Sequence, residues 1–499
     1  MRCVLAIDQS TSATKAVLVD DRGVLIGKAS REHRQYYPQP GWVEHDAEEI
    51  WSNVLSTARE LLQSQSGSAL EIGAISIANQ RETIVVFDRL TGRPLHPAIV
   101  WQCRRGDPLC ATHIANGHDA TVRARTGLRI DGYFSASKLQ WLMDERPDLA
   151  ERLRSGDACI GTMETYLVHR MTQGAVFATD PSNASRTLLF DIHRRTWDHE
   201  LCSLWQVPLR ALAEVRDCDA QFGETTLEGL FDKPVPICGV MGDSQAAMFG
   251  HRCFEIGSAK ATFGTGTSVL MNVGEWPPRA SGGSVISLAW VQDGHATYAL
   301  EGIINCSAST LNWLRDQLGL FVTVEEAERM AEAIDAESAA QSAVYLVPAF
   351  SGLGAPYWRD SARAAIVGLT TYSNRGHIVR AALDAIAYQV RDVLDMLQAE
   401  SGAGLRELHC DGGATRSSRL MQFTADMLGV PLRLPRYADC SAIGAAMMGM
   451  LGLGWYRSAA DLSELPNDTQ TYQRKMSSRD AERLYRGWQQ AVQQVLHVA

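Results

Sequence analysis

The chain lacks the cysteine and histidine patterns that mark disulfide frameworks and structural metal sites. Its 11 cysteines are scattered without a CxxC pair, and its 13 histidines include no HExxH sequence. An odd number of dispersed cysteines is typical of reduced, mostly buried thiols in a cytoplasmic protein. We therefore expect reduced cysteines and no structural metal centre.

Long apolar runs and an excess of positive charge are also missing. The stretch AAMMGMLGLGW, from Ala445, is far shorter than the ~20 residues that cross a bilayer. The N-terminal sequence reaches a charged residue at Asp8, which is not typical of a secretory signal. A net charge of -10 argues against the basic surface that nucleic acids or anionic membranes require. These features favour a cytoplasmic protein without nucleic-acid or membrane partners.

Low-complexity segments and proline- or serine-rich linkers are absent, so domains must be inferred from pattern. Apolar strands alternate with polar turns at Val4–Ile7, Ala16–Val19 and Val24–Ile26. The same strand–turn–strand pattern recurs near residue 260, in AKATFGTGTSVLMNVG, and helix-rich sequence follows it. We expect helices at 137–144, 377–400, 417–428, 442–451 and 479–497. The pattern predicts an α/β fold with two similar domains, 1–250 and 251–499; one long α/β domain is the alternative.

The common nucleotide-binding sequences are missing as well. There is no Walker A motif, no GxGxxG after a strand and no protein-kinase signature. The two turns offer another phosphate site, since converging N–H groups, small side chains and hydroxyls bind polyphosphates. Their candidate residues are Thr11, Ser12, Lys15, Gly264 and Thr265. Asp8, at a strand end, is placed to hold Mg²⁺. Ordinary turns, a turn-initiating aspartate and an idle lysine are the alternatives.

Three further stretches suit a polar substrate, and a fourth suits a nucleotide base. Arg81 and Glu82, in NQRET, and Trp101, in IVWQCRR, are expected at strand ends. There the charges can bond hydroxyls while the indole covers a C–H face; a surface ion pair beside a core tryptophan is the alternative. Asp243, in GDSQAAMFG, is a candidate base for a substrate proton and also a candidate helix cap; the two roles are compatible, since a helix N-terminus favours the ionised carboxylate. The Gly-Gly pair of CDGGATR either admits a flat adenine or forms a tight turn.

Together these stretches resemble the FGGY family of carbohydrate kinases, most closely its glycerol-kinase branch. The resemblance runs nearly end to end. It is most specific in NQRET, WQCRR and GAPYW, which follow one another in this order along the chain. It also includes SNASRTLLFDI, GDSQAA, FGTG, YALEG and CDGGATRSSRLMQF. It implies an actin-like fold of two ribonuclease-H-like domains with the active site in the cleft between them. It also implies phosphorylation of a terminal hydroxyl of a small polyol, first of all glycerol, with ATP and Mg²⁺, by a homo-oligomer (dimer or tetramer).

Carried over by motif, the resemblance gives each candidate residue a role. It makes Asp243 the general base and places Asp8 at the metal. The polyol-binding residues are Arg81, Glu82, Trp101, Tyr133, Asp243, Ser244 and Ser268. The nucleotide-binding residues are Thr11, Ser12, Lys15, Gly264, Thr265, Ala308, Asn312, Gly413, Ala414 and Ser417.

Two of these positions depart from the glycerol-kinase pattern. Ser244 stands where that branch generally has Gln, and Ser268 where it has an aromatic residue against the glycerol carbons. Both changes remove bulk, which implies a larger and more polar pocket. A four- or five-carbon polyol or ketose, such as erythritol, threitol or xylulose, is therefore the alternative substrate. The alternative from another class is a non-catalytic actin-like ATP-binding protein, against which the intact base and polyol-binding residues count.

Overall fold

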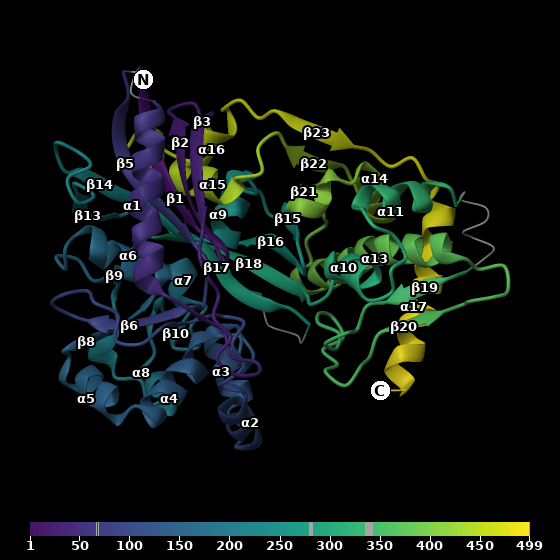
Figure 1. Ribbon diagram of the computed structural model, residues 1–499, viewed down its shortest axis with the longest axis horizontal. Helices are drawn as coiled ribbons and strands as arrows, with labels where there is room; N and C mark the ends of the chain where they lie inside the picture. The colour runs from purple at the N-terminus through teal and green to yellow at the C-terminus, as the bar shows by residue number, and fades with distance from the viewer. Residues whose placement is uncertain (66, 68, 279–282, 335–342, 499) are drawn as a thin grey trace.

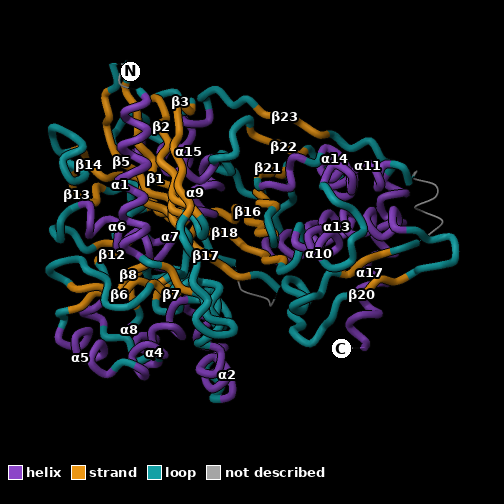
Figure 2. Tube along the Cα trace, viewed as in Figure 1, coloured by secondary structure: helices purple, strands orange, loops and turns teal. Residues whose placement is uncertain are grey.

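Two large sheets, one in each half of the chain, dominate the structure. The computed structural model describes residues 1–499 apart from 66, 68, 279–282, 335–342 and 499. Figure 1 shows the two sheets with helices packed around them. Figure 2 shows the strands in orange and the helices that pack against them in purple.

The first sheet has the strand order β13-β14-β5-β1-β2-β3. Its strands are β1 (Arg2–Gln9), β2 (Ala13–Asp20), β3 (Leu25–Glu32), β5 (Glu71–Asn79), β13 (Gln221–Thr225) and β14 (Val235–Gly242). The first three form the antiparallel meander expected from the sequence, while β5 and β14 run parallel to β1. Apart from its first residue β1 is entirely buried, which explains its continuous apolar run.

The second sheet repeats this arrangement. Its order is β17-β18-β16-β15-β21-β22-β23. The strands are β15 (Ala259–Phe263), β16 (Thr267–Gly274), β17 (Val285–Gln292), β18 (His295–Ile304), β21 (Leu408–Asp411), β22 (Leu432–Pro435) and β23 (Thr469–Tyr472). Antiparallel β15, β16 and β18 correspond to β1, β2 and β3, and β21 and β22 run parallel to β15. The recurring hairpin of the sequence thus opens a second copy of the same sheet, with β17 added at its edge.

The expected long helices are present, with boundaries shifted by a few residues. They are α4 (Ser135–Glu145), α13 (Arg375–Ser401), α14 (Ser418–Leu428), α15 (Cys440–Gly452) and α17 (Ser478–Val498). Helix α1 (Ala47–Ser64) and α15 cover opposite faces of the first sheet. Leu5 and Ile7 of β1 pack with α1, whereas Val4 and Ala6 pack with α15. A helix from the second half of the sequence therefore completes the core of the first.

Helix α9 (Asp243–Gly250) crosses α15 at very short range because glycines lie at the crossing. A Cβ atom on Gly444 would lie 1.7 Å from the carbonyl oxygen of Ala246, and one on Gly250 would lie 2.4 Å from that of Cys440. Even alanine at either glycine would push the two helices apart. The crossing thereby fixes the position of α9, whose first residue is Asp243.

A smaller layer lies beside the first sheet and was not predicted as a unit. Its four-stranded sheet contains β4 (Glu44–His45), β6 (Ile84–Asp88), β7 (Ala98–Ile99) and β8 (Ala158–Thr162). Other α-helices among the described residues are α2 (Asp107–Ala115), α3 (Asp119–Thr126), α5 (Pro147–Ser155), α6 (Met163–Met171), α7 (Pro181–Ala184), α8 (His199–Leu204), α10 (Ser309–Asp316), α11 (Val324–Glu332) and α16 (Ala459–Ser463). The remaining strands are β9 (Ala178–Thr179), β10 (Phe190–Asp191), β11 (Thr196–Trp197), β12 (Glu214–Val215), β19 (Tyr345–Val347) and β20 (Ala365–Val367).

All 11 cysteines are buried free thiols, as their scattered spacing predicted. In the part of the chain that the structure describes, no helix is both long and apolar enough to span a membrane.

Asp392, on α13, is a buried carboxylate held by three donors. It accepts hydrogen bonds from the Tyr485 hydroxyl at 2.6 Å, Trp488 Nε1 at 2.8 Å and the Tyr357 hydroxyl at 2.9 Å. Burial raises the pKa of Asp392 to about 6, although the three donors oppose the rise. Its contribution to stability is therefore present below the unfolded-state pKa of about 4 and is lost as the pH rises through about 6.

We expect Asp392→Asn to remove this pH-dependent contribution, because the amide does not ionise. Between about pH 4 and pH 7, the unfolding free energy of the wild type should fall relative to that of the variant by about 3 kcal/mol. Urea denaturation of both proteins across this range measures the difference. A difference that is the same at every pH would contradict the assignment.

Candidate active site

The carboxyl ends of three neighbouring parallel strands bring the main predicted residues together. Asp8 lies near the end of β1, Arg81 and Glu82 follow β5 closely, and Asp243 follows β14 directly. Because β14, β5 and β1 are adjacent and parallel, these side chains gather at one edge of the sheet. Glu82 has a φ of 61°, an uncommon value for a residue other than glycine, so the chain turns sharply there.

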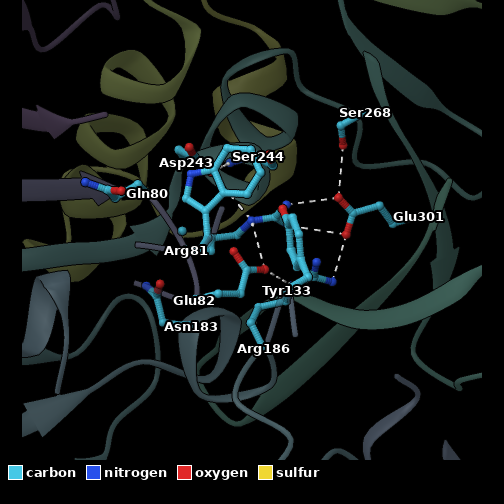
Figure 3. Close-up of polar contacts among 12 residues, drawn as sticks. Gln80, Arg81, Glu82, Tyr133, Asn183, Arg186, Asp243, Ser244, Ser268 and Glu301 are labelled. Carbon is cyan, nitrogen blue, oxygen red and sulfur yellow. Dashed lines mark hydrogen bonds and ion pairs between the residues drawn. The ribbon is translucent and has the colours of Figure 1, made fainter. Parts of the chain in front are cut away.

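Arg81 and Glu82 belong to a buried cluster of charges. They are only 4% and 1% exposed, so the alternative of a surface ion pair is wrong. Arg81 Nη2 donates to Glu301 Oε1 at 2.9 Å, and its Nε lies 3.6 Å from Asp243 Oδ1 and 3.8 Å from Glu82 Oε1. Arg186 Nε donates to Glu82 Oε1 at 2.6 Å, and its Nη1 lies 2.8 Å from Glu301 Oε2. Figure 3 shows these contacts. We call Arg81, Glu82, Arg186 and Glu301 the arginine–glutamate cluster.

The two carboxylates of the arginine–glutamate cluster differ in their electrostatics. Burial opposes ionisation of Glu301, but Arg186 and Arg81 outweigh it and lower the pKa of Glu301 to about 2. Burial raises the pKa of Glu82, and the same two arginines oppose that rise only in part. Glu301 is therefore the stronger partner of both guanidiniums, and it is firmly ionised.

Asp243 is the accessible carboxylate beside the arginine–glutamate cluster. Its side chain is 33% exposed, and its Oδ1 accepts a hydrogen bond from the backbone N–H of Ser244 at 2.6 Å. The cap position of α9 is occupied by Gly242, and no side chain caps the helix, so the helix-cap interpretation of Asp243 is wrong. Gly242 N–H donates instead to Ser182 Oγ at 2.8 Å. The Asp243 side chain is thus partly exposed to solvent, while the backbone that carries it is hydrogen-bonded at the start of α9.

Two aromatic residues and two serines lie around these charges. The rings of Trp101 and Tyr133 are 5.2 Å apart, and Trp101 Nε1 donates to Thr11 Oγ1 at 2.9 Å. Trp101 is half-buried, not a core residue. Ser268, on β16, donates to Glu301 Oε1 at 3.0 Å, and Ser244 follows Asp243 on α9. Figure 3 places both serines near the arginine–glutamate cluster.

The loop that carries Tyr133 is anchored by Lys138. The buried ammonium of Lys138 donates to the carbonyl oxygens of Gly132, Tyr133 and Phe134, at 2.5, 2.8 and 3.0 Å. Burial lowers the pKa of Lys138 to about 8. Burial also raises the pKa of Tyr133, which therefore stays a neutral phenol.

Asp8 presents a carboxylate oxygen that lacks a partner. Asp8 is 4% exposed; its Oδ2 accepts from Lys15 Nζ at 3.2 Å, whereas its buried Oδ1 has no hydrogen-bond partner among the described residues. Lys15 Nζ also lies 3.5 Å from Asp439 Oδ1, and Asp439 Oδ2 accepts from Lys28 at 3.0 Å. Burial raises the pKa of Asp8, and Lys15 opposes the rise. A buried, unpaired carboxylate oxygen fits a divalent cation, since oxygen ligands suit Mg²⁺.

The two predicted phosphate turns have different surroundings. At the first, Thr11 is bonded by Trp101, and Ser12 is exposed at the turn between β1 and β2. At the second, Gly264 N–H donates to the Gly266 carbonyl at 2.9 Å, and Thr265 is exposed. Each turn therefore leaves a hydroxyl-bearing residue exposed at its tip.

The start of α10 closes against the second turn. Ala308 N–H donates to the Gly264 carbonyl at 3.2 Å, and Asn312 N–H donates to the Ala308 carbonyl at 3.4 Å. Gly413 and Ala414 lie in a short 3-10 turn after β21, the parallel neighbour of β15. Ser417 Oγ accepts from Leu420 N–H at 3.2 Å and so caps α14. Gly264 and Thr265 thus follow β15 and Gly413 and Ala414 follow β21, at the carboxyl ends of two adjacent parallel strands.

Both halves of the chain match models of one protein family. The N-terminal domain model of the FGGY family of carbohydrate kinases matches residues 3–250, and the C-terminal domain model matches residues 259–453. The chain belongs to this family. It is therefore a carbohydrate kinase, a phosphotransferase that acts on an alcohol group.

Individual relatives of this FGGY kinase support the same assignment. The glycerol kinase of Halorhodospira halophila is 46% identical over 98% of this chain and 96% of its own, and that of Desulfitobacterium hafniense is 44% identical over 99% of each. The crystal structure of Plasmodium falciparum glycerol kinase with ADP matches with a TM-score of 0.93 at 34% identity, covering 99% of this chain and 98% of its own. Xylulose kinase from Rhodospirillum rubrum has a TM-score of 0.87 at 24% identity over 99% of each chain, which shows the shared fold alone. The predicted fold of two ribonuclease-H-like domains is confirmed.

The site of this FGGY kinase contains two charged residues that the sequence analysis did not assign. Arg186 lies in NASRTLLF and Glu301 in TYALEGII, and both are fully buried. For Glu301 a signal was present, because a single charge inside an apolar strand needs a partner when the strand is buried. The partners themselves come from distant parts of the chain, so the sequence did not identify them.

Proposed function

We propose that the protein transfers the terminal phosphoryl group of ATP to a terminal hydroxyl of glycerol, giving glycerol 3-phosphate. The observation that carries the proposal is the partly exposed Asp243 carboxylate beside the buried Arg81 and Glu82. These residues lie at the strand ends of a chain that is 46% identical to a glycerol kinase over 98% of its length. Phosphorylation of a polyol requires a base next to residues that bind the other hydroxyls.

Asp243 is the proposed general base. A polyol hydroxyl is a weak acid, so a carboxylate within hydrogen-bond reach can take its proton as the oxygen attacks phosphorus; this contributes about 10²–10⁴-fold. Arg81 and Glu82 are proposed to bind the other hydroxyls, and the paired rings of Trp101 and Tyr133 to cover the C–H face. Most of the remaining acceleration comes from holding the two substrates in line, because the transition state of phosphoryl transfer is loose.

The nucleotide is proposed to lie over the two turns and the second sheet edge. Thr11, Ser12 and Lys15 would contact phosphate oxygens from one side and Gly264 and Thr265 from the other. The adenine would lie against Gly413 and Ala414, bordered by Ala308, Asn312 and Ser417, as the resemblance implies. Mg²⁺, when bound, neutralises phosphate charge, and Asp8 with its unpaired Oδ1 is the residue proposed to hold it.

A direct product assay tests this function. Purified protein, ATP, Mg²⁺ and glycerol should yield glycerol 3-phosphate and ADP in equal amounts, measured by phosphorus NMR. Omission of glycerol should stop ADP formation, which separates a kinase from an ATP-binding protein with a slow ATPase. Nucleotide binding without any polyol phosphate would contradict the proposal.

The two serines at the site are proposed to set the substrate preference. Ser268 Oγ donates to Glu301 rather than forming an apolar wall, and Ser244 is half-buried beside Asp243. We expect Ser268→Phe combined with Ser244→Gln to fill the pocket and raise the kcat/KM ratio of glycerol to erythritol by about 10-fold or more. Ser268→Ala, which loses the hydrogen bond but adds no bulk, is the control. An unchanged ratio in the double variant would place both positions outside the polyol pocket.

We also propose that the chain divides near residue 250 into domains 1–250 and 251–499. The repeated sheets and the matched ranges of the two family models support this division. Helix α15 belongs to the second range but packs on β1 of the first. The homo-oligomeric state, dimer or tetramer, and the cytoplasmic location stay predictions; analytical ultracentrifugation measures the former.

A further inference from the structure

Glu301 joins the two halves of the molecule at the site. It lies on β18 of the second sheet and is fully buried. Its Oε1 accepts from Arg81 Nη2 at 2.9 Å and from Ser268 Oγ at 3.0 Å, and its Oε2 accepts from Arg81 Nη1 at 3.4 Å and lies 2.8 Å from Arg186 Nη1. Both arginines belong to the first half of the chain. Glu301 is thus the point at which the second sheet holds the guanidiniums beside Asp243 (Figure 3).

The orientation of Arg81 decides whether Asp243 is free. Arg81 directs both terminal nitrogens toward Glu301, although Nη1 also donates to Gln245 Oε1 at 3.3 Å, and only its Nε lies near Asp243, at 3.6 Å. Arginine and carboxylate prefer a two-point contact. Without the Glu301 charge, the carboxylates left to the Arg81 fork are Glu82, whose Oε1 already accepts from Arg186 at 2.6 Å, and Asp243. Gln245 would still accept from Nη1, but Asp243 would be the carboxylate that attracts the Arg81 fork most strongly. A two-point contact there would occupy the lone pairs that the substrate proton needs.

The charge balance points the same way. In the arginine–glutamate cluster two guanidiniums offset two carboxylates, so Asp243 lies beside a neutral group of four. Arg81, after β5, lies within 4 Å of Asp243, and Asp8 on β1 acts on it electrostatically. Glu82 after β5 and Glu301 on β18 contact Arg81, and Arg186 after α7 contacts both glutamates. Neutralising Glu301 leaves one net positive charge next to Asp243, which favours its carboxylate form and makes it a weaker base.

We propose that Glu301 is a positioning residue for the reaction: it holds the Arg81 fork away from Asp243 and thereby keeps the Asp243 carboxylate free to accept the substrate proton. The inference rests on the proposed function, in which Asp243 is the base. It adds a role to a residue that does not itself contact the reacting atoms.

The test is the pH profile of Glu301→Gln. We expect kcat for glycerol to fall about 10- to 100-fold and the acidic limb of the kcat profile to move to lower pH by about one unit. The KM for ATP should change less than about 2-fold, because the amide alters no predicted nucleotide contact. Glu301→Asp, which restores the charge on a shorter side chain, should recover much of kcat and return the limb toward its wild-type position.

Asp392→Asn is the matched control, because it also neutralises a buried carboxylate with several donors, but outside the site. It should change stability without moving the kcat profile. If Glu301→Gln lowers the melting temperature and keeps the wild-type profile and kcat, Glu301 is only structural and the proposal is overturned. If Glu301→Gln does not fold, Glu301→Asp decides by the same profile.

The failure of this inference is distinguishable from failure of the proposed function. If Asp243→Asn is active, the general-base assignment of Asp243 is wrong. If the wild type phosphorylates no polyol, the proposed kinase function is wrong. An inactive Asp243→Asn enzyme together with an unchanged Glu301→Gln profile would remove only the role of Glu301.

Discussion

Asp243→Asn is expected to lower kcat for glycerol by about 10²–10⁴-fold or to abolish turnover, with ATP binding intact. The amide matches the carboxylate in shape and can still accept from Ser244 N–H, but it cannot take a proton from a hydroxyl. The helix should be unaffected, because Gly242 and not Asp243 occupies its cap position. Steady-state kinetics together with ATP titration by calorimetry separate loss of chemistry from loss of binding.

Asp480→Asn provides the control for this variant. It also removes a carboxylate from the first turn of a helix, α17, but its side chain is half-exposed and contacts the nearby Ser477 and Arg483. Its kcat should equal that of the wild type. Wild-type turnover in Asp243→Asn would remove the general-base assignment, whatever the substrate.

Asp8→Asn is expected to lower kcat by about 10²–10³-fold at moderate Mg²⁺ and to raise the Mg²⁺ concentration needed for half-maximal rate. Asp8 Oδ1 is buried without a partner in the described part of the chain, whereas Oδ2 is bonded to Lys15. The amide keeps the shape and loses the charge that a divalent cation requires. Mg²⁺ titrations of the reaction rate measure the effect.

Asp20→Asn, at the opposite end of the β1–β2 hairpin, is the matched control. Asp20 is also buried, but its Oδ1 accepts from the backbone N–H of Arg22 at 3.0 Å and of Val24 at 2.8 Å, which an amide oxygen can replace. This variant should keep the wild-type Mg²⁺ dependence. Equal Mg²⁺ dependence of Asp8→Asn and the wild type would take Asp8 out of the metal site.

Local sequence patterns predicted the local parts of the fold. The apolar stretches at Val4–Ile7 and Ala16–Val19 lie within β1 and β2, and the helix expected at 377–400 is α13, Arg375–Ser401. Such elements follow from spacing alone. The small sheet beside the first domain was not predicted, because strands such as Ala98–Ile99 are too short to leave a periodic signal. The position of α15 on the first sheet is set by glycine packing between distant segments, which no local pattern contains.

The same distinction holds at the site. The type and place of Arg81, Glu82 and Asp243 were predicted from their motifs, and the structure brings them together at adjacent strand ends. Burial of the Arg81–Glu82 pair was not predicted, since it depends on Arg186 and Glu301, which are far away in sequence. A motif can therefore indicate that an arginine and a glutamate bind the polyol. The ion pairs that balance their charges form only in the folded chain.

The central claim is that this FGGY kinase phosphorylates glycerol in preference to longer polyols. The most direct measurement is a coupled assay of ADP release with Mg²⁺ and ATP, comparing kcat/KM for glycerol, erythritol, threitol, xylitol, xylulose and ribulose. We expect glycerol to exceed every other substrate by about 10-fold or more. A higher kcat/KM for a four- or five-carbon substrate would contradict the claim and identify Ser244 and Ser268 as the changes that redirected the site.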